Sequence, residues 1–260
     1  MGGSSVLLAM GQMLVKYGDA AHNLARAEWM IREAALRSCH IVVLPECLDA
    51  GWTHPEARML GRSIPGEYSD RLCRAAEENG VYVAAGLTEV SGECVYNAAI
   101  LISPAGDILL KHRKINELAI ARDIYSIGDR LGVVRTPLGV IGVNICADNF
   151  PESLVLGHSL ARMGAQIIVS PSAWAVEAEY DNERTPYGGL WLQSYEALSR
   201  AHGMAVVGVS SVGRIDAGVW QGRKCIGSSL AVGAGGKLLA RAAYGEDAED
   251  LVCVRIELPR

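Results

Sequence analysis

The sequence predicts an α/β domain in which mixed β-sheets pack against helices, and three observations support this fold class. Half of the 260 residues are hydrophobic and 20% are charged, which is enough apolar material for a large core. Segments with strand-like and helix-like periodicity alternate along the chain, and hairpins interrupt them. We identify no linker, repeat or low-complexity segment. We therefore expect a single domain over residues 1–260, with a flexible leader at 1–5.

In the first half of the chain, strands and helices are predicted to alternate before a hairpin. The strands cover residues 6–12, 41–44 and 81–87, the helices open at Asp19 and Ser69, and the hairpin covers 97–110. The run from Ile41 to Leu44 is apolar without alternation, which is typical of a strand buried on both faces. The pair Asn79-Gly80 predicts the end of the second helix.

The second half opens with a polar, helix-prone insert at 114–130, and a second hairpin follows at 133–146. Asp148, Asn149 and Pro151 predict the cap and first turn of a helix that continues through Leu154 and Ala161. The remainder is predicted as a strand at 166–170, a long loop, a helix near 191–201, and strands and hairpins over 204–213, 225–242 and 250–258.

Composition argues against several classes of protein. The net charge of −5 and the short basic group at 111–114 do not suit a nucleic-acid-binding surface. No apolar run approaches the roughly 18 to 20 residues of a membrane-spanning helix, and the start resembles neither a signal peptide nor a myristoylation signal. The seven cysteines are scattered and lack metal-binding spacing. We expect a cytoplasmic protein without a metal, in which most cysteines are small buried thiols.

Cys146 is the candidate nucleophile, because it lies at the end of a predicted strand just before a helix opens. We expect an exposed sulfur there, with the N–H of Ala147 directed at a developing oxyanion and the helix N-terminus favouring the thiolate. The alternative is an inert buried cysteine, which is the common case for a single free cysteine.

Glu46 and Lys114 also follow predicted strands, in chain order before Cys146. Each has a plainer interpretation, as a surface acid or salt-bridge partner and as a solvated lysine. Together, the three residues suit hydrolysis of an amide bond. Glu46 would take the thiol proton and later activate water, Lys114 would keep Glu46 ionised and stabilise the oxyanion, and Cys146 would form the acyl intermediate. No clear Cys–His pair is present, although His112 precedes Lys114 closely.

Three segments around these residues resemble the signatures of the nitrilase or carbon–nitrogen hydrolase superfamily, in order and in spacing. They are "VVLPE" at Glu46, "HRKI" at Lys114 and "ICADNFPE" at Cys146. The resemblance extends from about Val6 to about Leu258. It implies a four-layer αββα sandwich of two mixed β-sheets flanked by helices, a Glu-Lys-Cys triad, no metal or organic cofactor, and a homodimer or larger homo-oligomer.

One departure from the family pattern concerns a second glutamate, which members often carry before a Gly-Asp pair. The aligned position here is Ala121, and Glu117 lies four residues earlier, one turn back if this segment is a helix. Glu117 is a candidate to position Lys114 or the substrate, and Asp123 is a weaker one. The alternative is that Glu117 is a solvated helix residue.

The substrate is less determined than the reaction. Nitrilases of this family often have Trp-Glu after the nucleophile, and the pair Ala147-Asp148 is closer to the amidase and carbamoylase pattern. We expect hydrolysis of a small carboxamide or N-carbamoyl compound with release of ammonia. The residues proposed to line the substrate pocket, each of which could equally be a packing or loop residue, are Trp52, Trp174, Asn182, Arg184, Tyr187 and Trp191.

Two further hypotheses remain open from the sequence. A nitrilase proper would convert a small nitrile to acid and ammonia. A non-catalytic scaffold of the same fold would leave Cys146 no faster to alkylate than Cys47 or Cys225, because an unactivated thiol keeps its ordinary reactivity. A redox role for the cysteines is weaker, since no second cysteine lies near Cys146 in the sequence.

Overall fold

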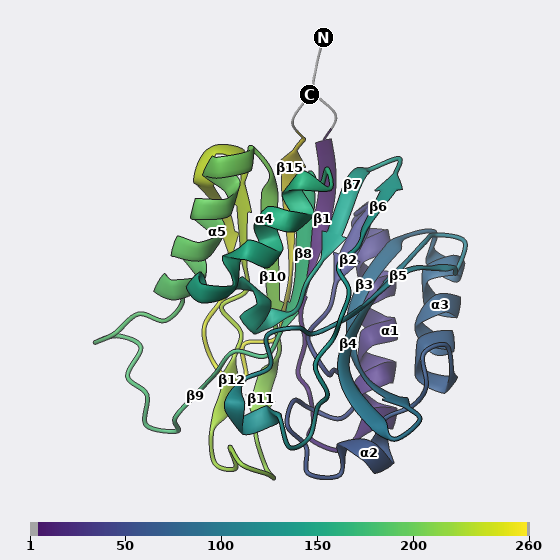
Figure 1. Cartoon of the computed structure of the whole chain (residues 1–260), viewed down its shortest axis with the longest axis vertical. Helices are drawn as coiled ribbons and strands as arrows, with labels where there is room; N and C mark the ends of the chain where they lie inside the picture. Colours follow the sequence, from purple (N-terminus) through teal and green to yellow (C-terminus); the bar gives the residue numbers. More distant parts are fainter. Residues whose placement is uncertain (1–4, 259–260) are drawn as a thin grey trace.

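The computed structural model describes residues 5–258 and contains two six-stranded mixed sheets and a small three-stranded one (Figure 1). The strand order of the first sheet is β15-β1-β2-β3-β4-β5. Its strands are β1 (Ser5–Gln12), β2 (Ile41–Val43), β3 (Tyr82–Ser91), β4 (Cys94–Ile102), β5 (Ile108–Arg113) and β15 (Asp250–Glu257). The strands β1, β2 and β3 run parallel, whereas β15, β4 and β5 pair antiparallel with their neighbours.

The second sheet has the order β14-β13-β10-β8-β7-β6, with a parallel centre formed by β7, β8 and β10. Its strands are β6 (Val133–Thr136), β7 (Gly139–Val143), β8 (Ile167–Ser172), β10 (Ala205–Ser210), β13 (Leu230–Gly233) and β14 (Lys237–Arg241). The small sheet has the order β11-β12-β9 and consists of β9 (Ala175–Val176), β11 (Val212–Arg214) and β12 (Lys224–Ile226).

Helices cover the outer faces of both sheets, so the predicted αββα sandwich is confirmed. The helices are α1 (Ala20–Leu36), the short α2 (Ala57–Leu60), α3 (Glu67–Asn79), α4 (Leu154–Arg162) and α5 (Gly189–His202). One apolar core lies between the two sheets and continues under α4 and α5, and a second fills the space between the first sheet and α1 and α3. None of the helices described for residues 5–258 combines the length and the apolar character that crossing a membrane requires.

The N-terminal halves of the first two long helices show how local sequence sets their boundaries. The side chain of Asp19 accepts a hydrogen bond from the N–H of His22, which caps α1 as predicted. The second long helix, α3, begins at Glu67, two residues before the predicted start. Ser69 lies within its first turn, and its hydroxyl accepts a hydrogen bond from the N–H of Gly66.

The helix predicted for the insert at 114–130 is wrong, and the helix predicted through Leu154 and Ala161 is present but begins later than expected. The insert at 114–130 contains a single 3₁₀ turn, Ala119–Ala121, and is otherwise irregular. Cys146 is followed by two 3₁₀ turns, Cys146–Asn149 and Pro151–Ser153, so the α-helix begins only at Leu154. Of the predicted leader, residues 1–4 lie outside the described residues, whereas Ser5 already belongs to β1.

Candidate active site

Glu46 lies three residues after the end of β2, and its backbone lies against both sheets. Its N–H donates to the carbonyl of Ser172 at the end of β8 (3.2 Å). A Cβ on Gly86 of β3 would lie 2.5 Å from the Cα of Glu46, so this close approach requires glycine at position 86. The Glu46 side chain is 1% exposed, which means that the carboxylate depends on partners inside the protein.

Two of those partners are Lys114 and Asn97. The Nζ of Lys114 lies 2.6 Å from Oε1 of Glu46, and Nδ2 of Asn97 donates to the same oxygen at 2.5 Å. The N–H of Lys114 donates to the carbonyl of Asn97 (2.8 Å), which fixes the lysine just after β5. Oε2 of Glu46 has no hydrogen-bond partner among residues 5–258, so one carboxylate oxygen remains available for proton transfer.

Glu46, Lys114 and Asn97 form a buried cluster, and Glu117 from the irregular insert belongs to it as well. Its Oε2 lies 3.8 Å from Nζ of Lys114, and its side chain is buried. The interpretation of Glu117 as a solvated helix residue is therefore wrong, and so is the helical geometry that related it to Ala121. Asp123, the weaker candidate, lies on the exposed side of the insert.

The protonation of the cluster follows from burial and charge. Burial acts to lower the pKa of Lys114, but the carboxyl groups of Glu117 and Glu46 raise it well above its usual value, so the ammonium is retained. Burial raises the pKa of Glu117 to about 7, with Glu46 and Asp148 acting in the same direction and Lys114 opposing them. Lys114 is thus a fixed positive charge beside a carboxyl group that titrates near neutrality.

Cys146 occupies a strained backbone position at the start of a 3₁₀ turn. Its φ of +42° lies in the left-handed region that non-glycine residues rarely adopt. The N–H of Cys146 donates to the hydroxyl of Ser170 on β8 (3.1 Å), and Nδ2 of Asn149 donates to the same hydroxyl (2.9 Å). These bonds hold the nucleophile against the end of the neighbouring parallel strand.

The state of the sulfur differs from the prediction. Cys146 is 8% exposed rather than open, and no α-helix begins at its turn. Burial raises the pKa of its thiol and Glu46 raises it further, while Lys114 and the N–H of Ala173 only partly oppose this. The thiol is therefore protonated at neutral pH, and the negative charge of Glu46 contributes to this state.

Asp148 fastens the lysine segment to the nucleophile turn. Its Oδ1 accepts the N–H groups of Ile115 (3.1 Å) and Asn116 (2.7 Å), and its Oδ2 accepts the N–H of Ile145 (2.9 Å). Nε2 of His112 lies 2.9 Å from Oδ2, so His112 pairs with Asp148 and not with Cys146. Burial acts to raise the pKa of Asp148, but His112 and the backbone N–H groups hold it below its ordinary value.

No sequence pattern indicated this arrangement. The position of Asp148, two residues after Cys146, predicted only a helix cap. Asn97 and Ala173 were also missed. Ala147 is buried in the nucleophile turn, and its carbonyl accepts a hydrogen bond from Nδ2 of Asn116 (2.8 Å).

Among the aromatic residues predicted to line the pocket, Trp52 lies against the lysine of the cluster, whereas Trp174 and Trp191 belong to the same apolar core as Cys146. Nζ of Lys114 lies 5.3 Å from the centroid of the Trp52 ring. Trp174 and Trp191 stack on each other, with ring centroids 4.9 Å apart, and the hydroxyl of Tyr187 accepts a hydrogen bond from Nε1 of Trp191 (3.0 Å). These three residues form a packed aromatic group over the second sheet.

Asn182 and Arg184 lie in the loop 177–188, away from the hydrogen bonds of the cluster. Oδ1 of Asn182 accepts the N–H of Tyr187 (2.8 Å) within this loop. Arg184 is exposed, and its N–H donates to Oδ1 of Asp181 (3.0 Å). Their described contacts stabilise the loop itself.

A small cavity of about 10 Å³, the size of one water molecule, adjoins Glu46. Its walls include Tyr17, Trp52, Val212, Gly213 and Cys225. It lies where the ends of β2 and the small sheet meet, so the cluster faces a narrow and mainly apolar space.

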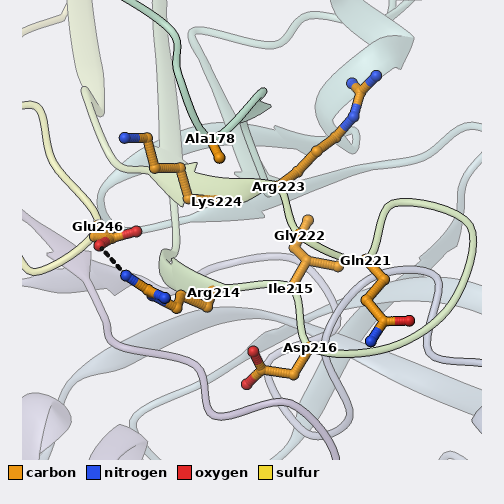
Figure 2. A pocket seen from close by; sticks show the side chains of 9 residues that line it. All are labelled: Ala178, Arg214, Ile215, Asp216, Gln221, Gly222, Arg223, Lys224 and Glu246. Carbon is orange, nitrogen blue, oxygen red and sulfur yellow. Dashed lines mark hydrogen bonds and ion pairs between the residues drawn. The ribbon is translucent and has the colours of Figure 1, made fainter.

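A larger pocket of about 250 Å³ lies beside the small sheet and is charged (Figure 2). Arg214 and Lys224, paired across β11 and β12, line it, and Arg214 forms an ion pair there with Glu246 (3.1 Å). The neighbouring pair Gly213 and Cys225 lines the small cavity, and Arg214 belongs to the wall of that cavity as well. The charged pocket and the small cavity therefore share Arg214 as a wall residue and adjoin each other.

Comparisons with known proteins point in one direction. The carbon–nitrogen hydrolase family model matches residues 7–260. The chain is 34% identical over 165 residues to an omega-amidase from Xenopus tropicalis, covering 59% of each chain, and 36% identical over 174 residues to a nitrilase from Pyrococcus abyssi, covering 64% of each. The chain thus matches less than two thirds of the length of these relatives. A solved carbon–nitrogen hydrolase from Helicobacter pylori has the same fold, with a TM-score of 0.85 at 24% identity over 98% of this chain and 90% of that one.

Proposed function

Because this chain belongs to the carbon–nitrogen hydrolase family, we propose that it hydrolyses the C–N bond of a small carboxamide or N-carbamoyl compound and releases ammonia. The observation that carries the proposal is the buried cluster in which Lys114 lies 2.6 Å from Glu46. The charge of Glu46 in turn raises the pKa of the Cys146 thiol. An acid, an ammonium group and a thiol held together in this way are the groups that acyl transfer through a thioester requires.

In the first half of the proposed reaction, the carboxylate of Glu46 takes the thiol proton as the sulfur attacks the carbonyl carbon. The ammonium of Lys114 stabilises the resulting oxyanion, and the N–H of Ala147 is the second proposed donor. Glu46 then passes its proton to the leaving nitrogen. The C–N bond breaks, ammonia leaves, and the acyl group remains bound to Cys146 as a thioester.

In the second half, Glu46 takes a proton from water, and the oxygen of that water attacks the thioester carbon. The C–S bond breaks, and the proton held by Glu46 returns to the sulfur. The product is a carboxylic acid, or a carbamic acid that decomposes to an amine and CO₂. Lys114 keeps its proton throughout, because two carboxyl groups raise its pKa.

Glu117 is proposed as the residue that positions Lys114, in place of the glutamate absent at Ala121. Its carboxyl lies 3.8 Å from Nζ, and both side chains are buried. A carboxyl with a pKa of about 7 is only partly ionised at neutral pH, so it does not neutralise the charge that the oxyanion needs.

The cavity and the relatives both support a small substrate. The space beside Glu46 is narrow, and the similar proteins are named an omega-amidase and a nitrilase. Trp52 is the pocket residue with the best support, since it faces Lys114. Trp174, Tyr187, Trp191, Asn182 and Arg184 remain proposals for contacts with the distal part of a substrate. Nitrile hydrolysis is the second candidate, favoured by the Pyrococcus relative.

A panel of amides, N-carbamoyl compounds and nitriles, measured by ammonia release, tests the proposal. We expect an amide or carbamoyl compound to exceed its matched nitrile in kcat/KM. A slow substrate should add its acyl group to the intact protein, and Cys146→Ala should abolish the added mass. Full turnover by Cys146→Ala would contradict the proposal, and a preference for the nitrile would favour the second candidate.

We also propose that the protein acts in the cytoplasm as a homodimer or larger homo-oligomer. Its seven cysteines are all free, which suits a reducing compartment. Val155 on α4 and Leu190 on α5 expose 64% and 43% of their surface, and α4 packs beside α5. Light scattering coupled to size-exclusion chromatography measures the oligomer, and a monomer at micromolar concentration would contradict it.

A further inference from the structure

Two cysteines that are far apart in the sequence meet at the edge of the first sheet. The thiol of Cys39 lies 3.4 Å from the sulfur of Cys253, across a separation of 214 residues. Cys39 is buried in the turn between α1 and β2, whereas Cys253 is exposed on β15. No other pair of thiols is in contact within the part of the chain that the structure describes.

The backbone around the two cysteines holds them in place independently of the sulfurs. Cys253 is paired with Ala9 of β1, and β1 is in turn paired with β2, which begins just after Cys39. The N–H of Cys39 donates to the carbonyl of Ala34 at the end of α1 (3.0 Å), and Nη1 of Arg37 donates to the carbonyl of Leu251 (2.8 Å). The turn and the edge strand are therefore already fastened together on both sides of the thiol contact.

We propose that Cys39 and Cys253 are a modification site, where the protein forms a reversible intramolecular disulfide on contact with a low-molecular-weight disulfide such as oxidised glutathione. The sulfur of Cys253, as thiolate, attacks one sulfur of the oxidant and expels one thiol. The sulfur of Cys39 then attacks Cys253, forms the protein disulfide and expels the second thiol. Two protein thiols are oxidised and one small disulfide is reduced to two thiols.

The order of the two steps follows from accessibility. Cys253 is exposed and can meet the oxidant, whereas burial raises the pKa of Cys39 to about 12, with Cys253 adding to the shift. Cys39 therefore reacts second, from within the protein. The sulfurs must approach by about 1.4 Å to reach the S–S length of about 2.05 Å, which rotation of the two side chains can supply.

The expected consequence is a gain in stability without a change in catalysis. Cys39 precedes β2 and Glu46 follows it, so the cross-link and the catalytic cluster lie at opposite ends of that strand. The link joins the edge strand β15 to the α1–β2 turn and closes a loop of over two hundred residues. Closing so long a loop lowers the entropy of the unfolded chain, and we expect Tm to rise by about 5 °C or more.

Intact-mass measurement after incubation with oxidised glutathione tests this inference without using activity. We expect the protein to lose two hydrogens, peptide mapping to link Cys39 to Cys253, and a reductant to reverse both results. Cys39→Ser should stop at one glutathionyl group on Cys253, and Cys253→Ser should leave Cys39 unmodified. Cys73→Ser, which changes a half-buried cysteine on α3, is the matched control and should still cross-link.

Persistent glutathionylation of Cys253 in the unmutated protein, without a cross-link, would overturn the inference. A linked form whose Tm equals that of the reduced protein would overturn its structural consequence. Because the readouts are mass and Tm, they stay informative if the protein proves not to be an amidase.

Discussion

The nucleophile turn at 144–149 and the loop at 177–188 were both expected to serve the site, and their hydrogen bonds differ in kind. The polar groups of the turn bond to distant parts of the chain. Asp148 accepts from Ile115 and Asn116, and the N–H of Cys146 reaches Ser170. Around Asp181 and Asn182, the hydrogen bonds of the loop are instead local, such as that from the N–H of Tyr187 to Oδ1 of Asn182.

The nucleophile turn is thus held in place by distant parts of the protein, whereas the segment around Asn182 is held mainly by its neighbours in the sequence. Long-range bonds fix the turn to both sheets, and such fixation is what placing reacting groups within a few tenths of an ångström requires. Bonds within the loop stabilise its own shape, and Nη1 of Arg241 on β14 donates to the carbonyl of Tyr187 (3.0 Å), which ties the end of the loop to the second sheet. Five substitutions test this difference.

The largest effect is expected from Cys146→Ser in the turn. The hydroxyl is a far weaker nucleophile than the sulfur, so we expect kcat/KM to fall by about 10⁴-fold with little change in fold. Ammonia release and circular dichroism measure the two quantities. Cys225→Ser, in the wall of the small cavity, is the control and should retain activity. A comparable loss of kcat/KM in both variants would contradict the assignment of Cys146 as the nucleophile.

Next in size is the pH dependence of stability that Glu117 should produce beside the turn. Burial raises its pKa from the ordinary 4.5 to about 7. The folded protein therefore binds this proton more tightly than the unfolded chain does. The resulting stabilisation is complete below about pH 4.5 and is lost as pH rises through about 7, amounting to about 3 kcal/mol.

Glu117→Gln should abolish this component, so the free energy of unfolding should fall less between pH 5 and pH 8 than in the unmutated protein. Urea unfolding at the two pH values provides the measurement. Glu183→Gln, in the exposed loop, is the matched control and should preserve the original difference. An unchanged pH dependence in Glu117→Gln would show that Glu117 is not the group responsible.

Asp148→Asn tests whether the hydrogen bonds of Asp148, which join the lysine segment to the nucleophile turn, position the reacting groups. The amide nitrogen cannot accept the N–H of Ile145, so the turn should shift relative to Lys114. We expect kcat to fall by about 10- to 100-fold with a smaller change in KM, because misplacement affects the reaction more than binding. Asp181→Asn makes the same substitution in the loop and should reduce kcat less than about 3-fold. A rise in KM with unchanged kcat would indicate a role in substrate binding instead.

The smallest effects are expected in the loop. Asn182→Ala and Arg184→Ala should each change kcat/KM on a neutral amide less than about 3-fold, since neither side chain bonds to the catalytic cluster. Steady-state kinetics on a neutral amide and on one bearing a carboxylate check this. A tenfold or larger loss for the charged substrate in Arg184→Ala would restore Arg184 as a substrate-binding residue.

The fold was largely predictable because hydrophobic periodicity and turn residues are local signals. The strands at 41–44 and 97–110 and the cap at Asp19 were predicted from a few neighbouring residues. The insert at 114–130 was not, because burial of Ala121 and Tyr125 under the surrounding loops overrides its helical propensity.

The sequence predicted which functional groups form the site but not how they are arranged. The motifs indicated an acid, an amine and a thiol, but no local pattern predicts that Glu117 is buried or that Asn97 bonds to Glu46. The hydrogen bonds that Asp148 accepts from Ile115 and Asn116 join residues more than thirty positions apart in the sequence. Such contacts arise from packing of the two sheets and leave no periodic signal.

The raised pKa of the Cys146 thiol has a practical consequence for anyone screening this protein with electrophiles. A sulfur that keeps its proton until a ligand arrives is dormant toward simple alkylating reagents, and so resists accidental damage. Burial raises the pKa values of Cys47 and Cys225 too, so labelling of Cys146 no faster than theirs is what a working enzyme and an inert scaffold would both display. A warhead built on an amide, able to trigger the proton transfer as it docks, is the reagent that tells them apart.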